Sequence, residues 1–368
     1  MFKKTICIVL WLNIITLAGC LQAKINYQDP HPFGQETQWA KRADNVAIGQ
    51  WWKPNPNDSK KEKQMREWII SRPREEAVAF ALYTHDHGVL KLTAQCFPLY
   101  PKEPKTGVLE LKQEGKWVAV QKQQVQYPGW SMHFRLENWD NSKNVPYRVR
   151  LGDLSEFEGL IRPDPVDKDT IVVASMSCNS YRDKTQFARA NMVKNLRKQD
   201  PDLLFFAGDQ SYRHDEHTYG WLEFGVMYGD VIKDRPTICI PDDHDVGHPN
   251  LWGEGGKVSK HKGGAADGGY WYPPSFVNMV ERCQTWNLPD PYDPTPVKQG
   301  IGVYYTSLNV GGISFAILED RKFKSGPMGK IPQMGPRPDH INDPSYDRKS
   351  IDKPGLTLLG DRQLDFLD

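Results

Sequence analysis

Two short apolar runs in the middle of the chain each end in a cluster of polar side chains. The run at 203–207 leads into Gly-Asp-Gln-Ser-Tyr at 208–212, and the run at 237–241 leads into Asp-Asp-His-Asp at 242–245. An uninterrupted apolar run is typical of a buried parallel strand. Ligands in open α/β sheets bind at the carboxyl ends of such strands, so the two clusters indicate one shared site. Their carboxylate and imidazole groups favour a metal ion.

The pattern around these runs predicts an α/β arrangement. An apolar strand at 171–174 precedes a helix at 183–199, which has apolar residues on one face and Lys and Arg on the other. The strand at 203–207 follows, and the three elements make a parallel pair with a right-handed crossover. The later pattern predicts one helix and three strands, at 217–232, 237–241, 302–310 and 313–318. The stretch 325–355 is a long loop rich in Pro, Gly and Asp, a type that is usually functional or disordered.

Residues 76 to about 162 show several short strands with regular turns instead. Apolar and polar side chains alternate at 90–96, and Glu114-Gly115 separates two runs as in a hairpin. This pattern predicts a small antiparallel sandwich. Three histidines are expected to be exposed on its strands or loops: His85, His87 and His133.

The amino end has the features of an export signal. Lys3 and Lys4 precede an apolar stretch at 6–17 that is short for a membrane span. It ends in Leu-Ala-Gly-Cys at 17–20, which resembles a bacterial lipobox and makes Cys20 a lipidated anchor to the membrane. The alternative is ordinary cleavage near Ala23, which leaves a soluble exported protein. Either way, the protein is expected outside the cytoplasm, in the periplasm or at the outer membrane or cell surface.

Composition narrows the class of protein. The 368 residues are enough for about two domains, and 47 Lys and Arg nearly balance 46 Asp and Glu. No basic footprint therefore argues for nucleic-acid binding. The 12 Trp residues favour a globular protein over disorder, and the cysteine spacings show no paired disulfide framework.

Three predicted strand ends carry the candidate chemistry. The first bears Ser-Cys-Asn at 177–179, with Cys178 in the middle, and the other two bear the clusters described above. Asp209 follows a glycine at a tight turn, and Tyr212 lies three residues further on. Asp243 and His244 arrive from the neighbouring strand. A hard trivalent metal suits carboxylate, phenolate and thiolate ligands, and a carboxylate shared between two ions is typical of two-metal hydrolases.

These motifs resemble the alkaline phosphatase D (PhoD-like) family of metallophosphoesterases. The resemblance rests on Gly-Asp-x-x-Tyr at 208–212, Asp-Asp-His-Asp at 242–245 and the upstream Ser-Cys-Asn. It extends to Leu-Glu-Asp-Arg at 318–321, and to Leu-Gly at 359–360 with Gln363. It implies a metallophosphoesterase-type αββα sandwich preceded by a small immunoglobulin- or fibronectin-like sandwich. It also implies hydrolysis of phosphomonoesters or phosphodiesters.

The resemblance implies a metal centre with ferric iron and a second divalent ion, most simply calcium. It gives Cys178 and Tyr212 as iron ligands and Asp209 as the bridging carboxylate. Asp243 stands where the wider superfamily has a metal-binding Asn.

The resemblance also implies catalytic roles. His244 contacts phosphate as a transition-state donor or general acid, and Asp245 orients His244. Arg321 is a candidate phosphate clamp or a structural ion pair, and Asn250 a candidate residue at the substrate rim. Asp242 is expected to cap its turn, whereas His214 and His217 are expected at the surface.

The chain departs from the family pattern at its carboxy end, where Gly-Asp-x-His-type ligand motifs are expected but not seen. The predicted segments are a signal with lipobox at 1–20, a tether and irregular lead-in at 21–75, the sandwich at 76–163, and a truncated phosphatase domain at 164–368. Within the lead-in, 60–70 is predicted as one helix. Three interpretations stay open: an exported phosphatase, a non-catalytic surface lipoprotein that keeps the fold as a binding scaffold, and an inactive truncated remnant.

Overall fold

The computed structural model describes residues 28–34, 37–180, 186–262, 266–336 and 340–368. The export signal and the predicted lipidation residue Cys20 lie outside the described residues. Within the described part, no helix is both long and apolar enough to cross a membrane.

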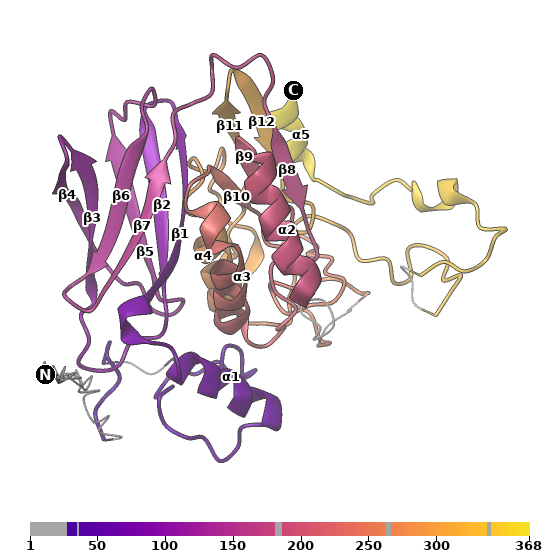
Figure 1. The fold of residues 1–368 in the computed structure, drawn as a ribbon. Coiled ribbons are helices and arrows are strands. Elements are labelled where there is room, and N and C mark those ends of the chain that lie inside the picture. Colours follow the sequence, from indigo (N-terminus) through magenta and orange to yellow (C-terminus); the bar gives the residue numbers. More distant parts are fainter. Residues whose placement is uncertain (1–27, 35–36, 181–185, 263–265, 337–339) are drawn as a thin grey trace, which may run out of the picture.

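Seven antiparallel strands form the amino-terminal half of the molecule (Figure 1). One sheet has the order β1-β2-β5 and the other has the order β4-β3-β6-β7. The strands are β1 (Val78–Asp86), β2 (Val89–Cys96), β3 (Thr106–Gln113), β4 (Lys116–Gln124), β5 (Ser131–Glu137), β6 (Val145–Leu151) and β7 (Ser155–Ile161). The predicted hairpin joins β3 to β4, and Glu114 and Gly115 both have the positive φ that a two-residue hairpin turn requires.

Two of the three sandwich histidines are buried, so the prediction that they are exposed was wrong for these two. His85 is 6% exposed and His133 is 4% exposed. One ring nitrogen of His133 lies 3.3 Å from the hydroxyl of Thr93 and the other lies 3.1 Å from that of Ser131. Hydrogen bonds of this kind let an imidazole stay in a core, whereas alternation along the strand alone gives no sign of such partners. His87 is exposed, as predicted.

A three-stranded parallel sheet lies beside the sandwich and has the order β10-β9-β8. Its strands are β8 (Val173–Met176), β9 (Leu203–Phe206) and β10 (Thr237–Cys239), and the helices around it are α2 (Gln186–Gln199), α3 (His217–Ile232) and α4 (Pro274–Thr285). The predicted strand–helix–strand unit and the second helix are confirmed, although β8 begins two residues later than expected.

Strands β11 (Thr306–Val310) and β12 (Ile313–Ile317) form a separate antiparallel pair. The turn is at Gly311-Gly312, as predicted, and both glycines have positive φ. The α/β class is therefore confirmed. The αββα sandwich stays a prediction, because the described strands of this half form one three-stranded and one two-stranded sheet.

Helix α3 connects the two halves, because it packs on β1 of the sandwich as well as on α2. The Trp221 ring lies 5.3 Å from the Phe80 ring in an edge-to-face arrangement. At Gly225, a Cβ atom would come within 1.9 Å of the Phe80 ring, so the close approach requires glycine. The sandwich is thus fixed to the helix that follows the Tyr212 turn.

The segment 37–75, called the lead-in here, is mostly irregular but well packed. Its helix α1 (Lys60–Ile70) has the predicted bounds and begins with a capping box between Ser59 and Glu62. Trp51 and Trp52 are buried, and the Trp51 indole donates a 2.9 Å hydrogen bond to the carbonyl of Leu99. A short turn of 3₁₀ helix, η1 (Arg74–Glu76), leads into β1. The tryptophans that the sequence scatters among charges therefore anchor the lead-in to the sandwich.

The carboxy-terminal loop is the segment 325–359, and its described residues extend away from the body of the molecule (Figure 1). Its helical content is the short η4 (Arg348–Ile351), and a similar turn, η3 (Lys298–Gly300), precedes β11. Helix α5 (Asp361–Leu367) returns to the body, where Gln363 exchanges hydrogen bonds of 2.7 and 2.8 Å with the backbone of Glu319.

Candidate metal centre

The three predicted strand ends meet at one edge of the parallel sheet. Strand β9 lies between β8 and β10, so its carboxyl end is flanked by those of both neighbours. The loop after β8 pairs with the loop after β9, because the Asn179 amide donates a 2.8 Å hydrogen bond to the carbonyl of Asp209. The parallel direction of the strands is what brings side chains from distant parts of the chain together.

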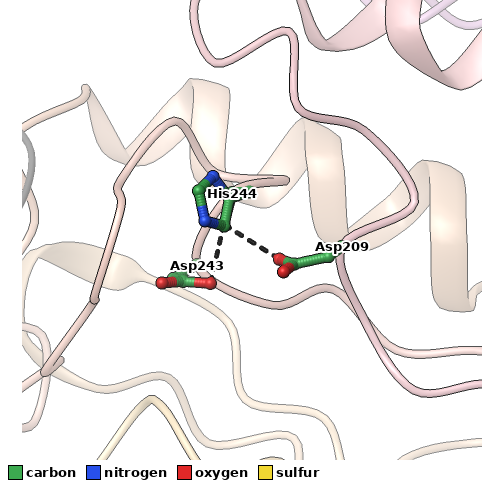
Figure 2. A group of neighbouring side chains, drawn as sticks. All are labelled: Asp209, Asp243 and His244. Carbon is green, nitrogen blue, oxygen red and sulfur yellow. Dashed lines mark hydrogen bonds between the residues drawn. The ribbon is translucent and has the colours of Figure 1, made fainter. Parts of the chain in front are cut away.

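Asp209, Asp243 and His244 form the centre of the site (Figure 2). One ligand atom from each lies within 4.8 Å of the others. The His244 amide donates hydrogen bonds of 3.3 Å to Asp209 and 3.0 Å to Asp243. A Cβ at the preceding residue Gly208, where φ is +87°, would come within 2.3 Å of Asp242. Glycine is therefore required for the loops after β9 and β10 to approach so closely.

The Asp209 carboxyl is held near other negative charge. Burial raises its pKa to about 6, and repulsion by Asp243 and Asp242 acts in the same direction. Hydrogen bonding from Tyr212 and the proximity of His244 oppose the shift. A bound cation would relieve the repulsion between these carboxylates, and this is the electrostatic arrangement expected of a metal site.

Tyr212 and Cys178 both lie against Asp209. The Tyr212 hydroxyl donates a 2.8 Å hydrogen bond to Asp209 Oδ2, and Cys178 Sγ lies 3.6 Å from the same oxygen. Burial is the largest cause of the raised pKa of Tyr212, with the neighbouring Cys178 and Asp209 adding to it. Cys178 is exposed and has a φ of 60°, a backbone conformation uncommon outside glycine. The four predicted metal-binding residues are thus brought together.

Asp245 has a different role from the predicted one. It is 1% exposed, and its Oδ2 accepts hydrogen bonds from the amides of Asp209 (2.8 Å) and Asp242 (2.9 Å). Its Oδ1 accepts from the Ser211 amide (3.0 Å) and from Gln284 (3.1 Å). Burial raises its pKa to about 7 and the charge of Asp209 adds to the shift, although the hydrogen bonds from Asp242, Ser211 and Gln284 oppose it. Asp245 therefore holds the loop after β9 to the loop after β10. Among the described residues, a different side chain orients the imidazole of His244.

That residue is His214, which the sequence interpretation placed at the surface. Its Nε2 makes a short hydrogen bond with Nδ1 of His244, and the two rings lie 4.6 Å apart. The Tyr212 ring packs 4.1 Å from the His244 ring on the same side of the site. His217 was also expected at the surface but is 1% exposed, with a nitrogen 3.1 Å from Gln284. The signal available in the sequence was the position of His214 in the same turn as Tyr212.

Arg321 and Asn250 lie beside the centre, and the Arg321 guanidinium is already paired with a carboxylate. The Arg321 guanidinium forms a bidentate pair with Asp242 and also donates a 3.2 Å hydrogen bond to the carbonyl of Leu251. Asn250 donates its backbone amide to Asp243. The geometry gives Arg321 a structural ion pair that fixes the loop after β10, which was one of the two alternatives.

Comparisons of this chain with known proteins found only weak similarity. No family model and no curated protein matches the chain. Among solved structures, the chain is similar to purple acid phosphatase PPD1 from yellow lupin (Lupinus luteus) seeds, with 13% identity and a TM-score of 0.40 over 64% of this chain and 43% of that chain. It is also similar to a Paenibacillus sp. cycloisomaltooligosaccharide glucanotransferase complexed with cycloisomaltoheptaose, with 17% identity and a TM-score of 0.21 over 36% and 20% of the two chains. The chain thus spans less than half of either structure, and at these TM-scores neither likeness supports an argument about function.

Proposed function

We propose that this protein is a metal-dependent phosphoesterase of the PhoD-like type. The observation that carries the proposal is the convergence of Asp209, Asp243 and His244 within 4.8 Å, with Cys178 and Tyr212 both against Asp209. Two carboxylates, a phenol, a thiol and an imidazole at one sheet edge are a donor set that can hold metal ions, and such ions would in turn bind phosphate.

The donors fit a ferric ion and a second divalent ion. Cys178 and Tyr212 would hold the iron, Asp209 would bridge the two ions, and Asp243 would hold the second, for which calcium is our proposal. When bound, such ions activate water and neutralise the charge that develops on phosphate during an in-line displacement. The phenol of Tyr212 needs this charge to ionise, because its surroundings raise its pKa.

The residues of the chain itself position the phosphate. When His214 Nε2 donates to Nδ1 of His244, the Nε2–H of His244 is left to donate a hydrogen bond to a phosphate oxygen or to the leaving group. The contact fixes the orientation of the imidazole, and Asp245 keeps both loops in register around it.

The test combines metal content with hydrolysis of p-nitrophenyl phosphate and bis(p-nitrophenyl) phosphate by the purified protein. Asp209→Asn is expected to lower metal content and to reduce kcat/KM by about 10²–10³-fold, because it removes the carboxylate charge that is proposed to hold both metal ions. Asp169→Asn is the matched control, since this exposed carboxylate lies outside the site. Tyr212→Phe is expected to abolish a visible absorption band of the iron-loaded protein.

Unchanged hydrolysis in Asp209→Asn would contradict the proposal. A metal-loaded wild-type protein that cleaves neither ester would favour the binding scaffold instead. Export and lipid anchoring at Cys20 stay predictions from the sequence, and we include a location outside the cytoplasm in the proposal on that basis alone.

A further inference from the structure

A basic pocket opens beside the candidate metal centre. It has a volume of about 410 Å³ and lies between the Tyr212 turn and the lead-in. Tyr212 and His214 line it, and both rings pack against His244. The pocket therefore lies next to the site proposed to bind the reacting phosphate, with the Tyr212 and His214 rings between it and His244.

The lead-in supplies the opposite wall. Lys41, Arg42 and Lys61 line this wall together with Glu62 and Met65. The wall is firmly held, because the Asp44 carboxylate accepts a 2.7 Å hydrogen bond from the Thr218 amide at the start of α3. In addition, the Val46 amide donates a 2.9 Å hydrogen bond to Glu216. A binding surface built this way is fixed before any ligand arrives, which lowers the entropic cost of binding.

The positive charge of the pocket exceeds what its own carboxylates neutralise. Arg213 is paired with Glu223, Lys262 with Asp215, and Arg42 more loosely with Glu62 at 3.6 Å. Among the described residues, Lys41 and Lys61 have no carboxylate within ion-pair distance. The Lys41 ammonium instead contacts the Trp271 carbonyl and ring.

These observations point to an anion as the occupant. Two lysines without carboxylate partners, which line a pocket next to the proposed phosphate-binding centre, are suited to a second phosphate group of the same substrate.

We infer that the basic pocket binds a second phosphate group, so that the preferred substrates are phosphate esters that carry two or more phosphates. This inference rests on the proposed function and names the substrate class of the same site. Lys61 and Lys41 of the lead-in bind the distal phosphate, whereas the centre at the strand ends binds the reacting one. The lead-in is thereby part of the substrate site and sets its specificity.

The test measures binding of a matched pair of ligands, fructose 6-phosphate and fructose 1,6-bisphosphate, by titration calorimetry with the metal-loaded protein. The wild type is expected to bind the bisphosphate about tenfold or more tightly than the monophosphate. Lys61→Ala is expected to reduce this ratio about fivefold, and Lys61→Glu is expected to abolish it. Lys63→Ala lies on the same helix outside the pocket lining and serves as the control that keeps the wild-type ratio.

Equal affinity of the wild type for the two ligands would overturn the inference. So would a Lys61→Ala variant that weakens both ligands by the same factor, because that result indicates general attraction and not a second subsite. The proposed function fails by a different result, the absence of ester hydrolysis and metal binding. The bisphosphate preference is read from binding and the proposed function from hydrolysis, so the two can fail separately.

Discussion

The lead-in and the carboxy-terminal loop are both polar and mostly irregular, yet they pack in opposite ways. The lead-in at 37–75 contains four aromatic residues, all of them tryptophans, whereas the loop at 325–359 contains one, Tyr346. Trp51 and Trp52 are buried in the lead-in, whereas Ile351 in the loop is 44% exposed. An irregular segment thus becomes part of the core when large side chains bury enough surface to offset the loss of conformational entropy.

Buried polar contacts also distinguish the lead-in from the carboxy-terminal loop. In the lead-in, Arg66 and Asp58 form an ion pair whose side chains are 6% and 4% exposed, and Arg66 also donates to the carbonyls of Val46 and Trp51. In the carboxy-terminal loop, the Lys330 ammonium pairs with Glu254 with 39% of its side chain exposed. Satisfied polar groups hold the lead-in in one conformation, which suits a wall of a binding site.

The largest expected effect comes from removing an anchor of the lead-in. Trp51→Ala should lower the free energy of unfolding by about 4 kcal/mol, because it leaves a large cavity and an unpaired Leu99 carbonyl. Ile351→Ala in the loop should change it by less than about 0.5 kcal/mol. Denaturant unfolding checks both variants, and similar losses in the two would remove the distinction between the segments.

A smaller effect is expected from breaking the buried ion pair. Asp58→Ala should cost about 3 kcal/mol, since it leaves the Arg66 guanidinium buried without its partner. Lys330→Ala should cost at most about 1 kcal/mol, because its pair is partly exposed to water. Thermal and denaturant unfolding measure both variants. An Asp58→Ala variant that is as stable as the wild type would contradict the expected difference between the lead-in and the carboxy-terminal loop.

The smallest effect concerns pH. Burial raises the pKa of Asp44 to about 6, and burial together with Asp44 raises the pKa of Glu216. A raised carboxyl pKa means that the native state holds a proton that the unfolded state has released, so this contribution to stability is lost as pH rises from about 4 to 6. The Asp44→Asn variant has no carboxyl to titrate at this position, so it does not lose this contribution. As pH rises from about 4 to 6, the free energy of unfolding of the variant should therefore increase by about 1–2 kcal/mol relative to that of the wild type.

The measurement is the free energy of unfolding at several pH values for the wild type, Asp44→Asn and Asp347→Asn. The last variant lies in the exposed carboxy-terminal loop and should keep the wild-type profile. A constant difference between Asp44→Asn and the wild type across this range would show that Asp44 does not titrate there.

Much of the fold was predictable because it depends on near neighbours in the chain. Helix α1 has the expected bounds since its capping box and apolar face are local, and the turns at Glu114-Gly115 and Gly311-Gly312 follow from the conformations these residues permit. The metal-binding candidates were also predictable, because each follows an apolar run that forms a parallel strand. Asp245 was correctly expected beside the site, but it accepts hydrogen bonds from backbone amides and does not contact the His244 ring. The sequence does not show which amides donate to a buried carboxylate.

The sequence by itself determined the strands, their polar ends and therefore the chemistry of the centre. Only the tertiary structure decided that His214 orients His244, that His133 and His217 are buried, and that Lys41 and Lys61 line the basic pocket. The physical reason is separation along the chain: the contact of Asp44 with Thr218 joins residues 174 positions apart. Hydrophobic periodicity reports which side of an element is buried, but it does not identify the distant element that covers that side.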